Sequence, residues 1–273
     1  MLSSRDKVSL PGSHVLVTGG SEGIGAAAAE IAAARGARVS LIARDPAKLA
    51  AAAARIGHDT ETSAADVADP DAVRTAVGRL VERQGPVDVV LSCAGYSHPG
   101  YSWEIPLEVY RRQMEVNYLG AVHVVAAVVP SMIERRRGHV SFVSSAAGLI
   151  GVYGYASYSP TKFALKGLGE TLRAELRPHG IGVSIVYPPD TDTPGFLHEN
   201  LTKPPETARF SATIAPISAA KMGAAIISGI EEGRLTITAD PLTALLARGA
   251  GLLGPLVRAM MDRDVRTEQR RRR

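Results

Sequence analysis

The sequence predicts an α/β fold, a Rossmann-like doubly wound parallel sheet of about seven strands with helices on both faces. Short apolar runs that suit buried strands alternate with helical stretches through most of the chain. The first run, 14–18, leads into a cluster of glycines and then into an alanine-rich stretch that favours helix. The order strand, glycine turn, helix is typical of sheets that bind a dinucleotide.

The composition indicates one core. The chain has 273 residues, 45% of them hydrophobic, and no stretch that reads as a domain linker. We expect a single dinucleotide-binding and catalytic domain over 1–240, followed by an apolar segment and a basic tail over 241–273. We find no run of about eighteen uncharged apolar residues and no secretory leader, which favours a cytoplasmic location.

The net charge of +4 is confined to the tail. From Arg258 to Arg273 there are seven arginines and three acidic residues, so the rest of the chain is balanced. With no basic surface and no recognisable nucleic-acid module on the body, we expect no nucleic-acid partner. The one cysteine, Cys93, excludes an internal disulfide, and its apolar surroundings favour core packing over a nucleophilic role.

The glycine turn is the first candidate part of a cofactor site. Glycines let backbone N–H groups approach a pyrophosphate, and the following helix N-terminus adds partial positive charge. The alternative is a tight turn with no ligand. The candidate cofactor-binding residues here are Gly19, Ser21, Glu22, Gly23 and Ile24.

The end of the second strand, 38–43, predicts which nicotinamide dinucleotide binds. An acidic residue at this position takes a ribose 2′-hydroxyl, whereas a neighbouring arginine accommodates a 2′-phosphate. Arg44 follows the strand and Lys48 comes one helical turn later, so we predict NADP(H). A solvated arginine at a strand end is the alternative, and the negative charge of Glu22 is unfavourable near a phosphate.

Further along, a third strand over 60–65 ends at Asp66 and Val67, which we expect beside the adenine. Asp66 could equally cap the next helix. Asp69 and Pro70 signal the start of that helix, which runs to about residue 84. A fourth strand over 87–92 then leads to Ala94 and Gly95, the expected floor beneath the cofactor.

A long helix over 107–137 carries Asn117 partway along it. An interior asparagine is mildly unfavourable in a helix, which favours a functional use, although a satisfied buried amide is the alternative. The arginines that end this helix read as a solvated helix end, followed by Gly138 as the stop signal.

The catalytic candidates follow the next strand, 140–144. Ser145 closes that strand, and Tyr158 and Lys162 are four residues apart, so on one helix they share a face. A free phenol titrates near pH 10, and a neighbouring ammonium favours the phenolate, so we expect Lys162 to lower the pKa of Tyr158. The Ser145 hydroxyl could polarise a carbonyl that Tyr158 protonates.

After a helix to about 178 and a strand over 181–187, a proline-rich loop runs over 188–216 at the ligand-binding edge of the sheet. A loop of this length usually covers something, so we expect a substrate lid. A helix over 218–232, a strand over 234–238 and an apolar segment over 241–261 complete the chain.

Together these residues resemble the short-chain dehydrogenase/reductase family over 13–240. The matching motifs are Thr18-Gly-x-x-x-Gly-x-Gly25, Asp66, Asn117, Ser145, Tyr158-x-x-x-Lys162 and Thr193, in that family's order and spacing. The resemblance implies that Tyr158 is the general acid in carbonyl reduction. It also implies that Lys162 holds the cofactor ribose, Ser145 binds the substrate oxygen, Asn117 maintains a proton-relay water and Thr193 contacts the nicotinamide. It implies no metal.

Two departures from the family pattern bear on nicotinamide placement: Ser92-Cys93-Ala94-Gly95 replaces Asn-Asn-Ala-Gly, and Pro188-Pro189 replaces Pro-Gly. Within the family, the chain is most similar to the reductases that act on the 3-keto group of a long-chain sphingoid base. The similar segments are 10–14, 41–44 and 187–204.

The resemblance implies a lipid ketone as substrate, and a homo-oligomer. A reductase of another lipid, a steroid or an acyl ketone is the alternative, and a non-catalytic NADP-binding sensor is a third hypothesis. The segment over 241–261 and the arginine tail could lie on the inner face of an anionic membrane or pack over the acyl pocket.

Overall fold

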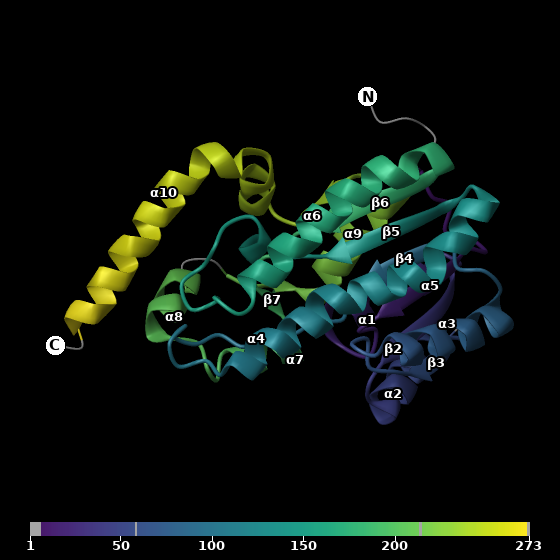
Figure 1. Cartoon of the computed structure of the whole chain (residues 1–273), viewed down its shortest axis with the longest axis horizontal. Helices are drawn as coiled ribbons and strands as arrows, with labels where there is room; N and C mark the ends of the chain where they lie inside the picture. The colour runs from purple at the N-terminus through teal and green to yellow at the C-terminus, as the bar shows by residue number, and fades with distance from the viewer. Residues whose placement is uncertain (1–6, 58, 213–214, 272–273) are drawn as a thin grey trace.

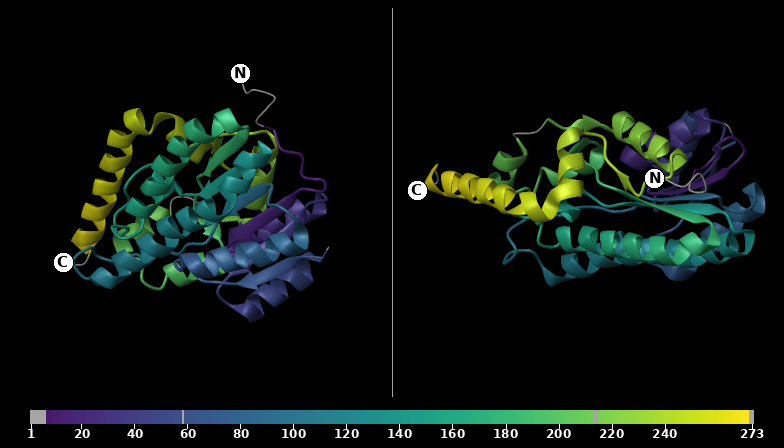
Figure 2. Two further views of the ribbon diagram at one scale, coloured as in Figure 1. Left: turned by 45° about the vertical axis from the view of Figure 1, so that its right-hand side comes forward. Right: turned by 90° about the horizontal axis from the view of Figure 1, so that it is seen from above.

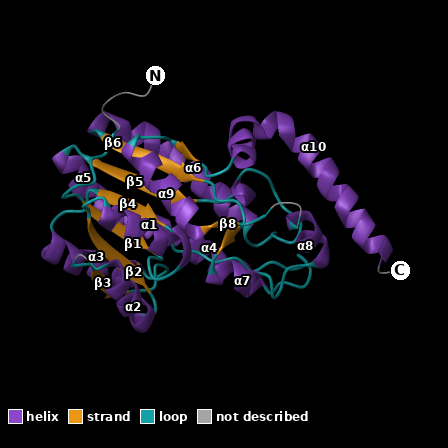
Figure 3. Ribbon diagram, turned by 180° about the vertical axis from the view of Figure 1, so that it is seen from behind, coloured by secondary structure: helices purple, strands orange, loops and turns teal. Residues whose placement is uncertain are grey.

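The computed structural model describes residues 7–57, 59–212 and 215–271. Within them, one parallel sheet of seven strands has the order β3-β2-β1-β4-β5-β6-β9 (Figures 1 and 3). The predicted fold class is confirmed. The strands are β1 (His14–Thr18), β2 (Arg38–Ala43), β3 (Glu61–Ala64), β4 (Val89–Ser92), β5 (Gly138–Val143), β6 (Ile181–Val186) and β9 (Thr236–Ile237).

Helices cover both faces of the sheet (Figure 2). One face packs against α1 (Gly23–Ala34), α2 (Pro46–Ile56) and α9 (Ala219–Glu231). The other packs against α3 (Pro70–Gln84), α5 (Gly120–Arg135) and α6 (Ser159–Leu176). A one-turn helix, η4 (Arg177–His179), follows α6 and ends at Gly180.

The strands are apolar on both sides because each side faces a helical layer. In β1, Val15 and Val17 join the core under α1 and α9, whereas Leu16 points into the core under α3 and α5. All three are fully buried. The short apolar runs of the sequence therefore correspond to central strands.

The order in which strands are added to the sheet reverses between β1 and β4, and ligands bind at this point in folds of this kind. The chain leaves the centre through β2 and β3 and returns beside β1 as β4. The turns that follow these two strands touch: a Cβ added to Gly19 would lie 2.8 Å from Ala94 backbone atoms. Only glycine permits this approach.

The predicted long helix over 107–137 is present over Leu107–Arg135, but a π turn interrupts its α-helical hydrogen bonding. The segment forms α4 (Leu107–Met114), one π turn, η2 (Glu115–Leu119), and then α5, which stops at Arg135. Gly138 is the first residue of β5 instead of a helix cap, and Arg136 adopts the left-handed conformation with φ 51°. The π turn contains Asn117, and such turns often occur at functional sites.

The prediction of an irregular loop over 188–216 is wrong. This segment forms β7 (Thr191–Asp192), α7 (Pro194–Glu199) and α8 (Pro205–Ser211), and β7 pairs in parallel with β8 (Ile217–Ser218). Prolines start both helices at positions where a missing N–H does no harm. Residues 213 and 214 of this segment lie outside the described residues.

The C-terminal segment forms α10 (Pro241–Arg271), which continues beyond the apolar stretch predicted to end at 261. Its backbone is interrupted at Gly249, with φ −132°. Beyond that point α10 runs as an arm along the edge of the molecule and contacts α8 (Figures 1 and 2). Arg272 and Arg273 of the basic tail lie outside the described residues.

Two helical stretches among the described residues are long and apolar enough, by length and composition, to cross a membrane. In Leu107–Arg135, 44% of the most apolar window is buried within the molecule, and this stretch contributes to the core. In Pro241–Arg271 the buried share is 11%. Several apolar side chains of α10 are exposed, namely Leu242, Leu245, Leu252, Leu256 and Met260.

Candidate functional site

The glycine turn leaves the start of α1 open. Gly19 and Gly23 have φ of +68° and +60°, a conformation that suits glycine. The N-cap residue, Glu22, makes no side-chain hydrogen bond to the first turn of α1, so its side chain satisfies none of the N–H groups there. Ser21 lies in the same turn, and Ile24 packs into the core behind it. This donor set fits a pyrophosphate.

The carboxylate of Asp66 lies at the end of β3 but does not cap α3. Asp69 caps that helix, accepting hydrogen bonds from Asp71 and Ala72 N–H groups at 2.9 and 3.0 Å. The N-cap alternative for Asp66 is therefore wrong. Asp66 instead accepts from Ala68 N–H at 3.0 Å and pairs with Arg112 of α4, a residue that sequence reasoning missed.

Burial alone would raise the pKa of Asp66, but these hydrogen bonds and the charge of Arg112 lower it below the usual value. Val67, the next residue, is buried against the start of α5, and a Cβ on Gly120 would lie 2.7 Å from its side chain. The structure thus presents an ionised Asp66 at the carboxyl edge, beside a buried apolar residue.

The two basic residues that follow β2 are in different situations. Arg44 is exposed and takes part in no ion pair among the described residues. The Lys48 ammonium lies 2.7 Å from the Glu22 carboxylate, and the hydrogen bond and charge of Glu22 raise the pKa of Lys48. Glu22, the unfavourable residue in the glycine turn, is therefore paired with one of the predicted phosphate ligands.

Tyr158 and Lys162 lie one helical turn apart, as their spacing predicts. Tyr158 immediately precedes α6, and the Lys162 N–H donates to its carbonyl at 3.4 Å. The Lys162 ammonium lies 5.4 Å from the Tyr158 ring centroid and donates to the Val143 carbonyl at 2.9 Å. Ser145 follows β5 and hydrogen-bonds the Tyr158 hydroxyl. The structure brings all three together.

Burial dominates the titration of this group. It raises the pKa of Tyr158 above the free value, and the negative charge of Glu199 raises it further, whereas the hydrogen bond from Ser145 lowers it. Burial lowers the pKa of Lys162 to about 8. The pKa of Tyr158 is raised and that of Lys162 is lowered because both groups lose the water that stabilises their charged forms, and the effect of Lys162 on the phenolate stays a prediction.

Asn117 is a satisfied buried amide. Its Oδ1 accepts from Tyr96 N–H at 3.0 Å, and its Nδ2 donates to the Tyr96 carbonyl at 3.0 Å and to the Thr161 hydroxyl at 3.1 Å. It thereby ties the segment after β4 to α6. A Cβ on Gly95 would lie 3.0 Å from Asn117 Oδ1 and 3.3 Å from Lys162 Nζ, so the floor of the site is closely packed.

Thr193 and Cys93 complete the residues that the sequence singled out. Thr193 caps α7 by accepting from Phe196 N–H at 3.1 Å, and its methyl group would lie 3.3 Å from a Cβ on Gly23. It thus links the predicted lid to the glycine turn. Burial raises the pKa of Cys93 to about 11, so the thiol is protonated at neutral pH, as expected for a residue that packs in the core.

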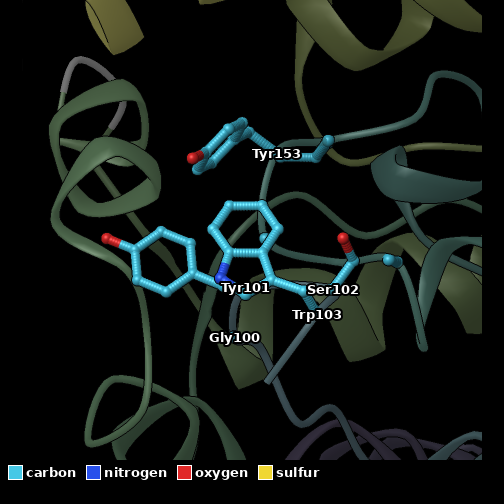
Figure 4. A pocket seen from close by; sticks show the side chains of 8 residues that line it. Gly100, Tyr101, Ser102, Trp103 and Tyr153 are labelled. Carbon is cyan, nitrogen blue, oxygen red and sulfur yellow. The ribbon is translucent and has the colours of Figure 1, made fainter. Parts of the chain in front are cut away.

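An aromatic pocket of about 200 Å³ lies beside the catalytic segment, and sequence reasoning missed it (Figure 4). The rings of Tyr101 and Trp103 stack with centroids 5.0 Å apart, and Tyr153 meets Tyr101 edge-on at 6.3 Å. Trp103 is 74% exposed. Three aromatic residues within a Gly- and Ser-rich pair of loops were the available signal. None of the catalytic candidates lines this pocket.

The part of α10 after Gly249 contacts the loops that line the aromatic pocket. The Met261 side chain is buried and accepts a hydrogen bond from the Tyr153 N–H at 3.2 Å. Asp264, one turn later, is also buried, and its Oδ1 lies 3.9 Å from Nε of Arg209 in α8. Part of α10 therefore packs beside the pocket, while the turns before Met261 expose their leucines.

Comparisons with known proteins agree with this geometry. The family model described as short chain dehydrogenase matches residues 13–203. A 3-dehydrosphinganine reductase of Danio rerio is 42% identical over 248 residues, which cover 88% of this chain and 75% of the relative. A 3-ketodihydrosphingosine reductase of Dictyostelium discoideum is 38% identical over 87% of this chain and 78% of the relative. A solved short-chain dehydrogenase from Streptomyces avermitilis is 29% identical, with a TM-score of 0.77 over 94% of this chain and 98% of that chain.

The depressed pKa of Lys162 predicts an alkaline stabilisation. An unfolded lysine titrates near pH 10.4, so between about pH 8 and pH 10 the unfolded chain binds more protons than the folded chain at this site. The free energy of unfolding of the wild type should therefore rise with pH relative to Lys162→Met, by ~1 to 3 kcal/mol from pH 7 to pH 10. Urea denaturation at both pH values measures this.

Lys166→Met, one turn further along α6 and partly exposed, controls for the loss of a lysine from this helix. Parallel stability curves for the wild type and Lys162→Met across this pH range would contradict the assignment.

Proposed function

Because the chain belongs to the short chain dehydrogenase family of oxidoreductases, we propose that it reduces the 3-keto group of 3-ketodihydrosphingosine to dihydrosphingosine with NADPH. The observation that carries this proposal is the similarity to curated reductases of that substrate over most of the chain. The juxtaposition of Ser145, Tyr158 and Lys162 supports it, since a carbonyl reductase needs a proton donor and a group to hold the carbonyl oxygen.

A reduced nicotinamide dinucleotide, when bound, would supply the hydride that the carbonyl carbon needs. The Tyr158 hydroxyl gives its proton to the carbonyl oxygen, which the Ser145 hydroxyl holds by a hydrogen bond. The phenolate left on Tyr158 is stabilised by the charge of Lys162, which the Val143 carbonyl holds in place. Because the pKa of Lys162 is about 8, this ammonium can also return a proton to the phenolate near neutral pH.

A nicotinamide dinucleotide is the cofactor class of the family, and we propose NADP(H) as the member used here. Arg44 supports this choice, because it follows β2, is exposed and takes part in no described ion pair, so a 2′-phosphate could contact it. Lys48 is close enough to help once it leaves Glu22. The glycine turn and the open start of α1 would hold the pyrophosphate, and Asp66 would face the adenine.

Two other hypotheses remain distinct from this proposal. A reductase of another lipid, a steroid or an acyl ketone would use the same catalytic residues, and the aromatic pocket beside them suits any apolar substrate. A dinucleotide-binding sensor would need no proton donor. The hydrogen bond between Ser145 and Tyr158, beside a buried lysine, favours an enzyme over a sensor.

The first test is turnover. We expect the protein to oxidise NADPH when 3-ketodihydrosphingosine is added, measured by the absorbance of the reduced cofactor. Tyr158→Phe should lower kcat by ~100-fold or more, because it removes the acid, while the dissociation constant for NADPH stays within about 3-fold of the wild type. Turnover of a steroid or a short ketoacyl compound with none of the sphingoid ketone would favour the first alternative. Undiminished turnover in Tyr158→Phe would remove the proposed acid.

The cofactor choice has its own test. Glu22→Gln removes a negative charge from the glycine turn and frees Lys48, so NADPH should bind ~2- to 5-fold more tightly, with little change for NADH. Glu30→Gln is the matched control, because Glu30 also joins α1 to α2 through an exposed ion pair, with Arg55. Fluorescence titration with each cofactor gives the dissociation constants. An equal change for NADPH and NADH would argue against a 2′-phosphate beside Lys48.

We also propose that α10 contacts an anionic membrane surface. The side chains of Leu252 and Leu256 are 89% and 61% exposed on this helix. Exposed arginines lie on its last turns, and a basic residue near such a surface contributes about 1 kcal/mol. A lipid substrate would enter from the same surface. Oligomerisation and a cytoplasmic location, which the sequence also suggests, stay predictions.

The membrane proposal predicts sedimentation with vesicles that contain phosphatidylserine and weaker sedimentation with pure phosphatidylcholine. Changing both Leu252 and Leu256 to Ser should reduce the bound fraction at least ~10-fold, because two buried leucines are lost from the interface. Leu107→Ser, at a leucine 76% exposed on α4, is the control for lost surface hydrophobicity. If the wild type stays in the supernatant at low salt, the proposal fails.

A further inference from the structure

A buried polar group lies next to the catalytic tyrosine, and the proton-transfer chemistry does not use it. We call it the Glu199 cluster: Tyr155, Asp190, Glu199 and Lys203. The Tyr155 hydroxyl donates to the Glu199 carboxylate, and the Lys203 ammonium lies 3.0 Å from a Glu199 oxygen. The side chains of Lys203 and Glu199 are only 3% and 14% exposed. Tyr155 comes from the segment before α6, and the other three residues come from the stretch 190–203 after β6.

The cluster holds two carboxylates but one ammonium. Asp190 feels the opposing charges of Lys203 and Glu199, and burial raises the pKa of its carboxyl. In the described part of the chain, Lys203 is the only cation in an ion pair with either carboxylate. The Lys203 ammonium also lies over the Phe196 ring, 4.6 Å from its centroid, and this contact helps to hold it in place. No cation is therefore paired with Asp190 in the described part of the chain, and burial favours its protonated form unless a cation comes close to it.

The Glu199 cluster lies close to the proposed site of reaction at Tyr158. The Tyr155 and Tyr158 rings are 5.8 Å apart between centroids. The charges of Glu199 and Asp190 both act on the Tyr158 hydroxyl, with Glu199 the larger of the two. A ligand whose oxygen is held by Tyr158 and Ser145 would thus present neighbouring atoms to the cluster.

The proposed substrate carries a cation at that place. In 3-ketodihydrosphingosine an ammonium group is bonded to C2, which is a single C–C bond of about 1.5 Å from the carbonyl carbon. The structure therefore assigns to the Glu199 cluster the recognition of the substrate's 2-ammonium group, with Glu199 as the main acceptor and Asp190 as the second. This inference rests on the proposed function and specifies how the site selects its substrate.

The assignment has a consequence for the acid. The two carboxylates hold the pKa of Tyr158 up, which weakens it as a proton donor. A substrate ammonium between them would offset their charge and favour the phenolate that proton transfer leaves behind. A cationic substrate would thereby assist its own reduction, whereas a neutral ketone in the same pocket would not.

The experiment compares 3-ketodihydrosphingosine with its analogue in which hydrogen replaces the 2-amino group. The wild type should have a kcat/KM at least ~10-fold higher for the amine, because a charge-assisted contact is lost with the analogue. Glu199→Gln should lower kcat/KM for the amine ~10- to 100-fold and leave that for the analogue within ~3-fold, so the preference disappears. Asp190→Asn should reduce the preference in the same direction, by less.

Glu206→Gln is the matched control. Glu206 is a buried carboxylate on α8 that accepts from the Tyr101 hydroxyl at 3.0 Å, as Glu199 accepts from Tyr155, but it lies outside the cluster. This variant should keep the wild-type preference for the amine, whatever its overall rate. Binding of NADPH shows that each variant is folded.

The outcomes separate the two proposals. If the wild type reduces neither compound, the proposed function fails. If the wild type reduces both compounds equally well, the function stands and the Glu199 assignment is overturned. A Glu199→Gln variant that slows both substrates by the same factor would likewise overturn it, because the cluster would then have a structural role only.

Discussion

The site depends on how the end of β5 holds Lys162. The Ser144 hydroxyl donates to the Lys162 carbonyl at 2.8 Å, and the Lys162 ammonium donates to the Val143 carbonyl at 2.9 Å. The end of β5 thus hydrogen-bonds both the backbone and the side chain of Lys162 in α6. Gly148 is part of this contact, since a Cβ there would lie 2.4 Å from the Ser144 hydroxyl. The orientation of α6, and with it the position of Tyr158, follows from this contact.

Low solvation is the second constraint. Burial raises the pKa of Tyr158 and lowers that of Lys162, so it disfavours the charged forms of both. Charges brought by ligands then have large effects, because little water screens them. The proposed roles of the dinucleotide and of a cationic substrate both depend on this weak screening.

The segment after β6 connects this chemistry to substrate choice. α7 is capped by Thr193, which lies against the glycine turn. The helix ends at Glu199, whose charge raises the pKa of Tyr158. One short helix therefore spans from the cofactor side of the site to the substrate side. α8 and α10 pack outside it, beside the aromatic pocket.

The sequence by itself determined the parts that depend on local patterns. The central strands, the glycine turn and the one-turn spacing of Tyr158 and Lys162 follow from apolar runs, glycine conformations and helical periodicity, which neighbouring residues set. Even here the ends of elements moved: the last strand covers only Thr236–Ile237 instead of 234–238.

Only the tertiary structure decided which distant charges meet. The pairs Lys48–Glu22, Arg112–Asp66 and Lys203–Glu199, the π turn at Asn117 and the helices in the predicted loop depend on packing between segments. Local propensity carries no information about such contacts, because a side chain's partner and its loss of water are set by the topology that surrounds it. The sequence alone therefore located Tyr158, the proposed acid, and the structure shows the burial and the neighbouring charge that raise its pKa.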